Sequence, residues 1–136
     1  MRAVLDTNVV VSGIFFGGVP RTLLEAWAEG RFELVLTPSI FDEYLRVCER
    51  LATTKPDLEF RPILTTLVGH GTLIADPVVD EPITTDPDDD KFMQCALGAT
   101  AVVVSGDSHL LEASGWRGVE VYTPRVFLKS LAVDGS

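Results

Sequence analysis

The sequence contains few cysteines and no long apolar run, and each shortage excludes a class of protein. The two cysteines, Cys48 and Cys95, lie in apolar helical patterns without CxxC spacing or neighbouring histidines. We therefore expect buried, unpaired thiols rather than disulfides, redox centres or metal ligands. No apolar stretch approaches the ~18 residues of a membrane span, and the first residues lack the pattern of a signal peptide. These features predict a soluble, cytoplasmic protein without membrane association.

Basic residues are also scarce, with 11 lysines and arginines against 20 acids and a net charge of −9. Residues 76–90 contain no base and seven acids: Asp76, Asp80, Glu81, Asp86, Asp88, Asp89 and Asp90. An acidic surface repels nucleic acid. However, carboxylates that bind a divalent cation reverse the sign of the local field. The charge balance thus argues against a simple basic nucleic-acid-binding module and leaves a metal-dependent nuclease open.

Three common catalytic and nucleotide-binding motifs are missing. The sequence has no GxxxxGK[ST], which excludes a phosphate loop of the nucleoside-triphosphatase type, and Gly17-Gly18 does not form GxGxxG. Ser105, Asp107 and His109 occur together, but no GxSxG elbow accompanies them. Hydrolysis by a serine nucleophile is therefore not indicated.

The sequence does show apolar strands that alternate with helices. We expect strands at Ala3–Leu5, Phe32–Leu36, Leu73–Ala75, Ala101–Val104 and Val119–Tyr122. We expect helices from Pro20 to before Gly30, from Pro38 to about Arg50, over Leu58–Val68, from Asp88–Asp90 to near Gly98, over Asp107–Ser114 and over Pro124–Leu131; Val9–Phe16 fits either state. This alternation predicts the α/β class, a three-layer α/β/α sandwich with a central parallel sheet of four to five strands. Residues 1–132 form the expected single domain and 133–136 a loose tail.

Carboxylates gather at one edge of this expected sheet. Asp6 follows the first strand, Asp107 follows Ala101–Val104, Glu43 lies in the helix after the second strand, and Asp88–Asp90 begin a later helix. The carboxyl ends of parallel strands share an edge, where ligands bind. Neighbouring carboxylates repel one another unless a cation compensates, and Mg²⁺ or Mn²⁺ prefers oxygen ligands. The pattern favours metal-assisted phosphodiester hydrolysis.

Each acid also has a purely structural interpretation. Asp88–Asp90 could cap a helix and complement its dipole, and Asp107 could cap the helix that follows it. Asp42 and Glu43 could lie on a solvated helix face, and Asp6 could be an ordinary loop residue. Because all four acidic segments are expected at one edge of the sheet, a single shared site is favoured over four unrelated structural roles.

Four motifs, taken in order, resemble the PIN domain, a family of small metal-dependent ribonucleases. They are Val4-Leu5-Asp6-Thr7-Asn8-Val9, Ser39-Ile40-Phe41-Asp42-Glu43-Tyr44, Asp86-Pro87-Asp88-Asp89-Asp90-Lys91-Phe92 and Val104-Ser105-Gly106-Asp107-Ser108-His109-Leu110-Leu111. The closing Tyr122-Thr123-Pro124-Arg125-Val126-Phe127-Leu128 is similar to the prokaryotic toxin branch of that family. The resemblance covers nearly the whole chain.

This resemblance implies a set of site residues. Asp6, Glu43, Asp89 and Asp107 match the acids that hold Mg²⁺ or Mn²⁺ and support catalysis, with Asp90 as a further candidate ligand. Asn8 and Ser105 match polar residues that support the acids. His109 departs from the family, which often has a further Asp at this position, and this puts a second metal in doubt.

The resemblance implies a metal-dependent endoribonuclease, the toxin of a type II toxin–antitoxin pair, with RNA as substrate and an antitoxin as partner. Arg21, Arg46, Arg50, Lys91 and Arg125 are candidate contacts to the RNA backbone. Homodimers are common in the family, and Val9–Phe16 or Leu23–Trp27 could supply the interface or belong to the core. The alternatives are a catalytically silent PIN-like module that binds RNA or protein, and a phosphohydrolase acting on a small phosphate ester.

Overall fold

A parallel sheet of five strands lies at the centre of the fold in the computed structural model, which describes residues 1–79 and 81–133. The strands are β1 (Arg2–Leu5), β2 (Glu33–Leu36), β3 (Thr72–Leu73), β4 (Val102–Val104) and β5 (Val121–Tyr122). Their order is β3-β2-β1-β4-β5, and each neighbouring pair is parallel. The expected sheet of four to five parallel strands is confirmed.

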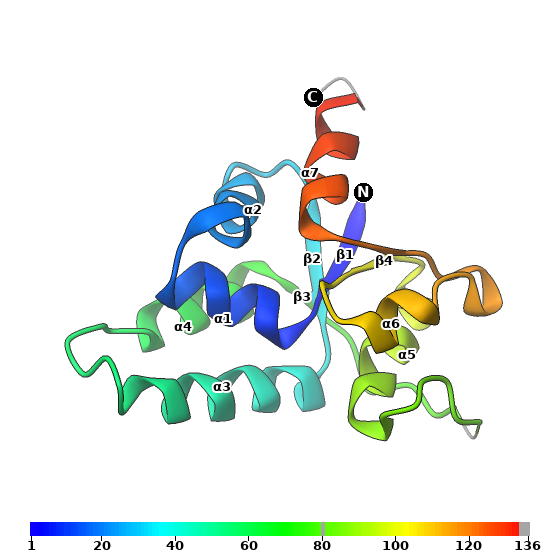
Figure 1. Cartoon of the computed structure of the whole chain (residues 1–136), viewed down its shortest axis with the longest axis horizontal. Helices are drawn as coiled ribbons and strands as arrows, with labels where there is room; N and C mark the ends of the chain where they lie inside the picture. Colours follow the sequence, from blue (N-terminus) through cyan, green and yellow to red (C-terminus); the bar gives the residue numbers. More distant parts are fainter. Residues whose placement is uncertain (80, 134–136) are drawn as a thin grey trace.

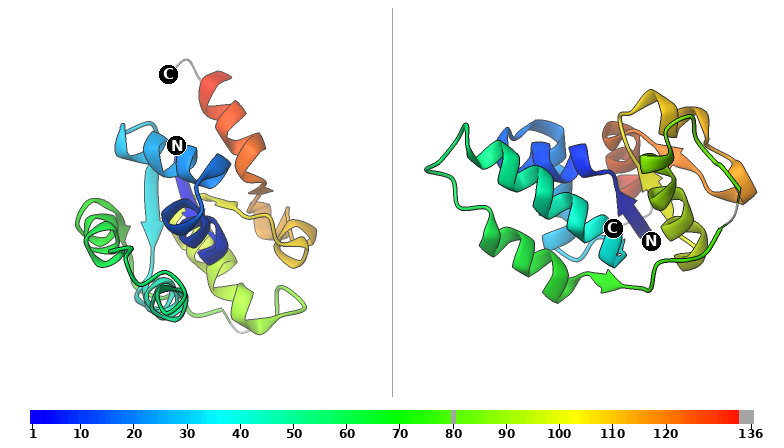
Figure 2. Two further views of the ribbon diagram at one scale, coloured as in Figure 1. Left: turned by 60° about the vertical axis from the view of Figure 1, so that its left-hand side comes forward. Right: turned by 90° about the horizontal axis from the view of Figure 1, so that it is seen from below.

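Helices cover both sides of this sheet. They are α1 (Thr7–Phe15), α2 (Gly18–Ala28), α3 (Pro38–Ala52), α4 (Arg61–His70), α5 (Asp90–Ala99), α6 (Ser108–Glu112) and α7 (Pro124–Val133), with 3-10 turns η1 (Pro87–Asp89) and η2 (Trp116–Gly118). Helices α1 to α4 lie on one side of the strands, and α5 and α6 lie on the other (Figure 1). Helix α3 runs beside α4, as both views of Figure 2 show. The expected α/β sandwich is therefore confirmed.

The ambiguous segment Val9–Phe16 is largely helical. The Asp6 carbonyl, directly after β1, accepts hydrogen bonds from the amides of Val9 at 3.0 Å and Val10 at 3.3 Å, and these bonds start α1. The apolar side chains of α1 and the residues Leu23 and Ala26 of α2 are buried within the monomer, so these segments contribute mainly to the core. In residues 1–79 and 81–133 no single helix could cross a membrane; α1 and α2 reach the required length and hydropathy only as a pair bent by 96°.

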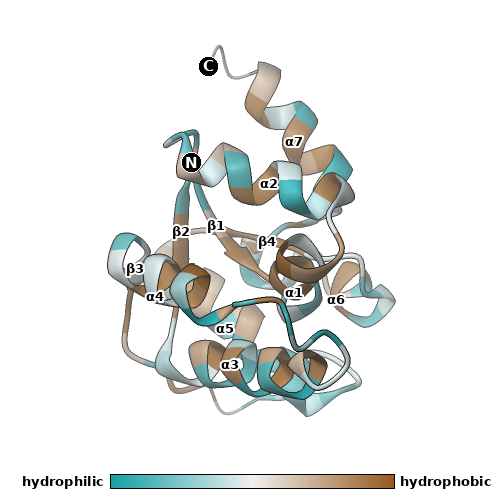
Figure 3. Cartoon of the chain, turned by 90° about the vertical axis from the view of Figure 1, so that its left-hand side faces the viewer, coloured by the Kyte–Doolittle hydropathy of each residue, from teal (hydrophilic) through white to brown (hydrophobic). Residues whose placement is uncertain are grey.

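Helix α3 starts and packs as its sequence predicts. The Thr37 side chain accepts a hydrogen bond from the Ile40 amide at 3.3 Å, and Pro38 occupies the first turn. The buried residues of α3 lie at every fourth position: Ile40, Tyr44 and Cys48. Figure 3 shows hydrophobic and hydrophilic residues along this helix. This amphipathic pattern fixes which side of α3 faces the core.

Both thiols are free and buried, as expected. Burial raises the pKa of Cys48 to about 11, and burial together with the charge of Asp76 raises the pKa of Cys95 to about 12. Neither thiol is therefore a reactive nucleophile at neutral pH.

Several expected boundaries were wrong. Helix α4 begins at Arg61 rather than Leu58, because Pro62 lacks an amide hydrogen and is accommodated only in the first helical turn. Strand β3 covers Thr72–Leu73 rather than Leu73–Ala75, since β2, its hydrogen-bonding partner, ends at Leu36 opposite Leu73. Helix α7 extends to Val133, one residue into the expected tail, and 134–136 lie outside the described residues.

Candidate active site

The register of β1 and β4 sets the centre of the site. Leu5 of β1 pairs with Val104 of β4, so Asp6 and Ser105 leave the sheet side by side. The Asp6 amide donates to the Val104 carbonyl at 3.0 Å, and the Ser105 hydroxyl donates to the Asp6 carboxylate at 2.7 Å. Both side chains are buried. Ser105, a predicted supporting residue, thus contacts Asp6 directly.

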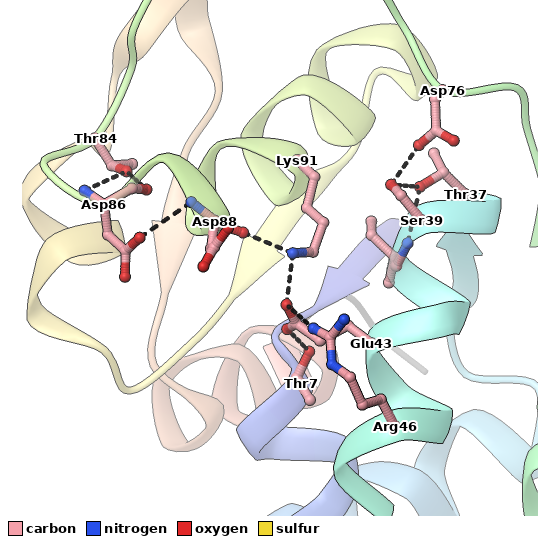
Figure 4. Close-up of polar contacts among 11 residues, drawn as sticks. Thr7, Thr37, Ser39, Glu43, Arg46, Asp76, Thr84, Asp86, Asp88 and Lys91 are labelled. Carbon is pink, nitrogen blue, oxygen red and sulfur yellow. Dashed lines mark hydrogen bonds and ion pairs between the residues drawn. The ribbon is translucent and has the colours of Figure 1, made fainter.

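Glu43 reaches the same edge from α3. The next residue, Tyr44, donates its buried hydroxyl to the Leu5 carbonyl at 2.5 Å and so ties α3 to the end of β1. One carboxylate oxygen of Glu43 accepts a hydrogen bond from the Thr7 hydroxyl, and the other accepts one from the Lys91 ammonium at 2.5 Å (Figure 4). Glu43 therefore faces the first turn of α1 and the start of α5, and it is not a solvated residue on a free face.

The three consecutive acids at the start of α5 have different surroundings. Asp90 is buried and accepts hydrogen bonds from the amides of Ile83 at 3.3 Å and Thr84 at 2.8 Å, and from the Thr84 hydroxyl at 2.7 Å. Asp88 is exposed, and its amide is capped by Asp86 at 3.0 Å. Asp89 makes no capping hydrogen bond. These contacts favour Asp89 as the acid available to a ligand and give Asp90 a structural task.

Asp107 caps helix α6 and is also one of the acids whose charge influences Asp6. Its side chain accepts a hydrogen bond from the His109 amide at 2.7 Å at the start of α6, as the capping interpretation predicts. Its own amide donates to the Ser105 hydroxyl at 2.9 Å. His109 turns to another segment, because its Nδ1 atom forms a hydrogen bond with the Thr85 hydroxyl at 2.6 Å. The residue that departs from the family pattern thus links α6 to the segment before α5.

The electrostatics indicate that these acids lie near one another. Burial raises the pKa of Asp6, and the charges of Asp107 and Glu43 raise it further, whereas the Ser105 hydrogen bond lowers it. Desolvation and nearby carboxylates raise the pKa of Asp89 to about 6, the carboxylates being, in decreasing order, Asp107, Asp6, Asp86 and Glu43. Mutual repulsion of this kind costs free energy, and a bound cation would relieve it.

The donor set fits a hard divalent cation in kind, but its ligands are not gathered around one point. Within residues 1–79 and 81–133, no three side chains of His, Cys, Asp or Glu are placed to hold a metal together. Glu43 is occupied by Thr7 and Lys91, and Asp107 by the His109 amide. All four candidates offer the carboxylate oxygens that Mg²⁺ and Mn²⁺ prefer. A bound ion would therefore require these side chains to rearrange.

The sequence did not predict that Thr7 contacts the site, and it marked Lys91 only as a candidate RNA contact. In the structure both residues form hydrogen bonds with Glu43. Thr7 is buried and contacts Glu43, whereas Asn8, the expected supporting residue, is exposed. The available signal was the position of Thr7 directly after Asp6, between the apolar residues 3–5 and 9–11. Of the candidate RNA contacts, Lys91 and Arg46 lie beside Glu43, at 2.5 and 3.8 Å.

The other candidate RNA contacts have different surroundings. Arg21 donates to the carbonyls of Gly13 at 3.0 Å and Ile14 at 3.1 Å near the end of α1, which is a structural task. Arg50 and Arg125 are exposed. Contact of these residues with RNA stays a prediction.

The raised pKa of Asp89 predicts a pH-dependent effect on stability. Because the folded state holds this proton more tightly than the unfolded state does, ionisation of Asp89 destabilises the fold increasingly between about pH 4 and pH 6. In EDTA, Asp89→Asn should therefore raise the melting temperature by a few degrees at pH 7 and by much less at pH 4. Asp42→Asn, at an exposed position, is the matched control. An Asp89→Asn effect that is equal at both pH values would contradict the prediction.

The fold and the site define an α/β protein with carboxylates at the carboxyl edge of a parallel sheet. The family model of the PIN domain matches residues 2–109. The chain therefore belongs to the PIN domain family. An uncharacterized protein of Methanocaldococcus jannaschii is 27% identical over 114 residues, which are 82% of this chain and 74% of that protein.

Solved structures show the same fold at low sequence identity. One match is a chain of VapBC2 from Rickettsia felis, in a crystal structure with a DNA fragment from the VapBC2 promoter. The TM-score is 0.61 at 11% identity, and the superposition covers 90% of this chain and 98% of that one. A chain of FitAcB from Neisseria gonorrhoeae gives a TM-score of 0.53 at 20% identity, with 90% and 98% coverage. A domain of a functionally unknown protein from Methanocaldococcus jannaschii gives 0.55 at 16%, with 90% and 89% coverage.

Proposed function

We propose that the protein is an endoribonuclease that hydrolyses RNA phosphodiester bonds with Mg²⁺ or Mn²⁺. The observation that carries this proposal is the convergence of acids from separate segments: Ser105 donates to Asp6 and accepts from the Asp107 amide, and Tyr44, next to Glu43, donates to the Leu5 carbonyl beside Asp6. The charges of Asp107 and Glu43 also raise the pKa of both Asp6 and Asp89. Membership of the PIN domain family supports it, since these domains are generally nucleases. The bound ion would supply an activated water and stabilise charge at phosphorus.

The chain's own residues divide the remaining tasks. Asp6, Asp89, Asp107 and Glu43 would hold the ion, with Asp6 oriented by the Ser105 hydroxyl. Arg46 lies at the rim with 71% of its side chain exposed, where it could pair with an RNA phosphate. Asp90 keeps Ile83 and Thr84 against the start of α5. The proposal gives Asp90 this positioning task and the ligand role to Asp89.

The proposal includes a biological setting, the toxin of a type II toxin–antitoxin pair in the cytoplasm. The fold shared with chains of VapBC2 and FitAcB, which are toxin–antitoxin complexes, supports an antitoxin as partner. A homodimer is part of the same proposal. The apolar side chains of α1, with Leu23 and Ala26 of α2, are buried in the monomer core, whereas Leu24 and Trp27 of α2 are partly exposed. Of the two candidate segments, Leu23–Trp27 therefore offers more surface to a second copy.

Cleavage of a mixed RNA pool tests the activity. Purified protein should cut the pool in Mn²⁺ or Mg²⁺, and EDTA should abolish cutting. Wild-type protein that binds RNA in Mn²⁺ but cuts none at any enzyme concentration would contradict the proposal. That outcome would favour a catalytically silent binding module, which the engagement of Glu43 by Lys91 and Thr7 makes the second candidate.

A further inference from the structure

Lys91 forms a sheltered ion pair inside the candidate active site. Its ammonium donates to Glu43 at 2.5 Å and to the Asp88 carbonyl at 2.7 Å (Figure 4). The two charged side chains are only 19% and 15% exposed, whereas the Arg2–Glu33 pair is 45% and 43% exposed. Partial burial reduces screening by solvent and salt, so this pair is a stronger interaction than an ordinary surface ion pair.

The pair occupies the carboxylate that a metal would need. One Glu43 oxygen accepts from Lys91 and the other accepts from the Thr7 hydroxyl. A divalent ion that binds Glu43 must therefore displace a donor or bind with an ammonium group very close to it. Two cations at one carboxylate repel each other, and the lysine has a flexible stem that can move away. The neutral hydroxyl of Thr7 opposes the ion far less.

We propose that Lys91 is a resident counter-ion of the site, which neutralises Glu43 while no metal is bound and leaves it when a divalent cation binds. This inference rests on the proposed function, because it requires that the carboxylates bind a metal. It adds that the chain stabilises its own metal-free state at the expense of metal affinity. Without the ammonium, the Glu43 carboxylate would lie uncompensated beside acids whose charges already raise the pKa of Asp6 and of Asp89.

A static positioning role for Lys91 makes the opposite prediction. If the lysine stayed on Glu43 and held it in the orientation that the metal needs, its removal would weaken metal binding. If Lys91 must leave, its removal should strengthen metal binding. The sign of the change in Mn²⁺ affinity therefore separates the two roles without any measurement of RNA cleavage.

Calorimetric titration of the full chain with Mn²⁺ measures that sign. Lys91→Met should bind Mn²⁺ about tenfold more tightly than wild type, the size expected for one charge a few ångströms from the ion in a partly shielded site. Lys91→Gln should behave in the same way and guards against poor folding of the methionine variant. Lys91→Arg retains the charge and should stay close to wild type.

Arg46→Met is the matched control for the loss of one positive charge beside Glu43. Arg46 lies 3.8 Å from the same carboxylate but is 71% exposed, so its removal should change Mn²⁺ affinity by less than about twofold. In a Glu43→Gln background, Lys91→Met should no longer tighten binding, because the effect acts through that carboxylate. In EDTA, Lys91→Met should melt at a lower temperature than wild type, and Mn²⁺ should stabilise it more.

The outcomes separate this inference from the proposed function. Wild-type protein that binds Mn²⁺ while Lys91→Met and Lys91→Gln bind it equally or more weakly would overturn the counter-ion role alone. Equal tightening by Arg46→Met, or tightening that persists with Glu43→Gln, would also overturn it, because a general change of net charge would then suffice. Absence of Mn²⁺ binding by every form would overturn the metal-dependent function, and the counter-ion role with it.

Discussion

Asp6→Asn is expected to reduce metal-dependent RNA cleavage by at least about a hundredfold while the fold stays intact. The Asp6 carboxylate is buried at the end of the central strand β1, where Ser105 orients it. Asparagine has nearly the same size and keeps an oxygen that can accept from Ser105, so the change removes the charge and little else. Because burial and nearby acids already raise the pKa of Asp6, losing the charge should not lower stability.

Cleavage rates in Mn²⁺ and melting temperatures in EDTA check this prediction. Asp42→Asn makes the same chemical change at an exposed position of α3 and should cut RNA at the wild-type rate. The two variants should be purified in parallel by the same procedure, so that any contaminating nuclease contributes equally to both preparations. Undiminished cutting by pure Asp6→Asn would remove Asp6 from the site.

Substitutions of the neighbours Asp89 and Asp90 should have opposite effects. Asp90→Ala should lower the free energy of unfolding by roughly 2–4 kcal/mol, because two amides and one hydroxyl lose a buried acceptor. Asp89→Asn should abolish cleavage with no loss of stability at pH 7, because it removes a charge that the fold disfavours. The comparison of the two variants would thus separate the structural role of Asp90 from the metal-binding role of Asp89.

Urea denaturation and cleavage assays on the same two variants measure this separation. Asp90→Asn keeps one acceptor oxygen and should lie between Asp90→Ala and wild type in stability. The assignment fails if Asp89→Asn retains activity and folded Asp90→Asn loses all of it, since Asp90 would then be the ligand.

Much of the fold follows from the sequence because its strands are strongly apolar. Ala101–Val104 predicts a buried central strand, and β4 lies between β1 and β5. Val9–Phe16 could not be assigned, because a short apolar run fits either a strand or a helix. Its helical state depends on hydrogen bonds to the Asp6 carbonyl and on burial between other elements, which are tertiary features.

The site follows from the sequence where an acid directly succeeds a strand. Asp6 and Asp107 could be placed at one edge because parallel strands end together, and the register of Leu5 with Val104 provides the physical basis. Asp89 and Asp90 could not be distinguished by the same logic. Their different surroundings depend on how residues 83 and 84 fold back onto the start of α5.

The contact between Lys91 and Glu43 lay beyond sequence reasoning for a similar reason. The two residues are 48 positions apart and come from helices whose relative rotation no local pattern specifies. The sequence marked Lys91 only as one of several bases that could meet RNA. Lys91 is mostly buried and forms an ion pair with Glu43, a candidate metal ligand, whereas Arg50 and Arg125 are exposed.

A crystal structure grown with Mn²⁺, with anomalous scattering recorded at the manganese edge, tests the central claim most directly. We predict an anomalous peak within coordination distance of Asp6, Glu43, Asp89 and Asp107, with the Lys91 ammonium withdrawn from Glu43. Crystals at saturating Mn²⁺ with no peak among these carboxylates, or with manganese bound only elsewhere, would contradict the claim that this edge of the sheet is a metal-dependent nuclease site.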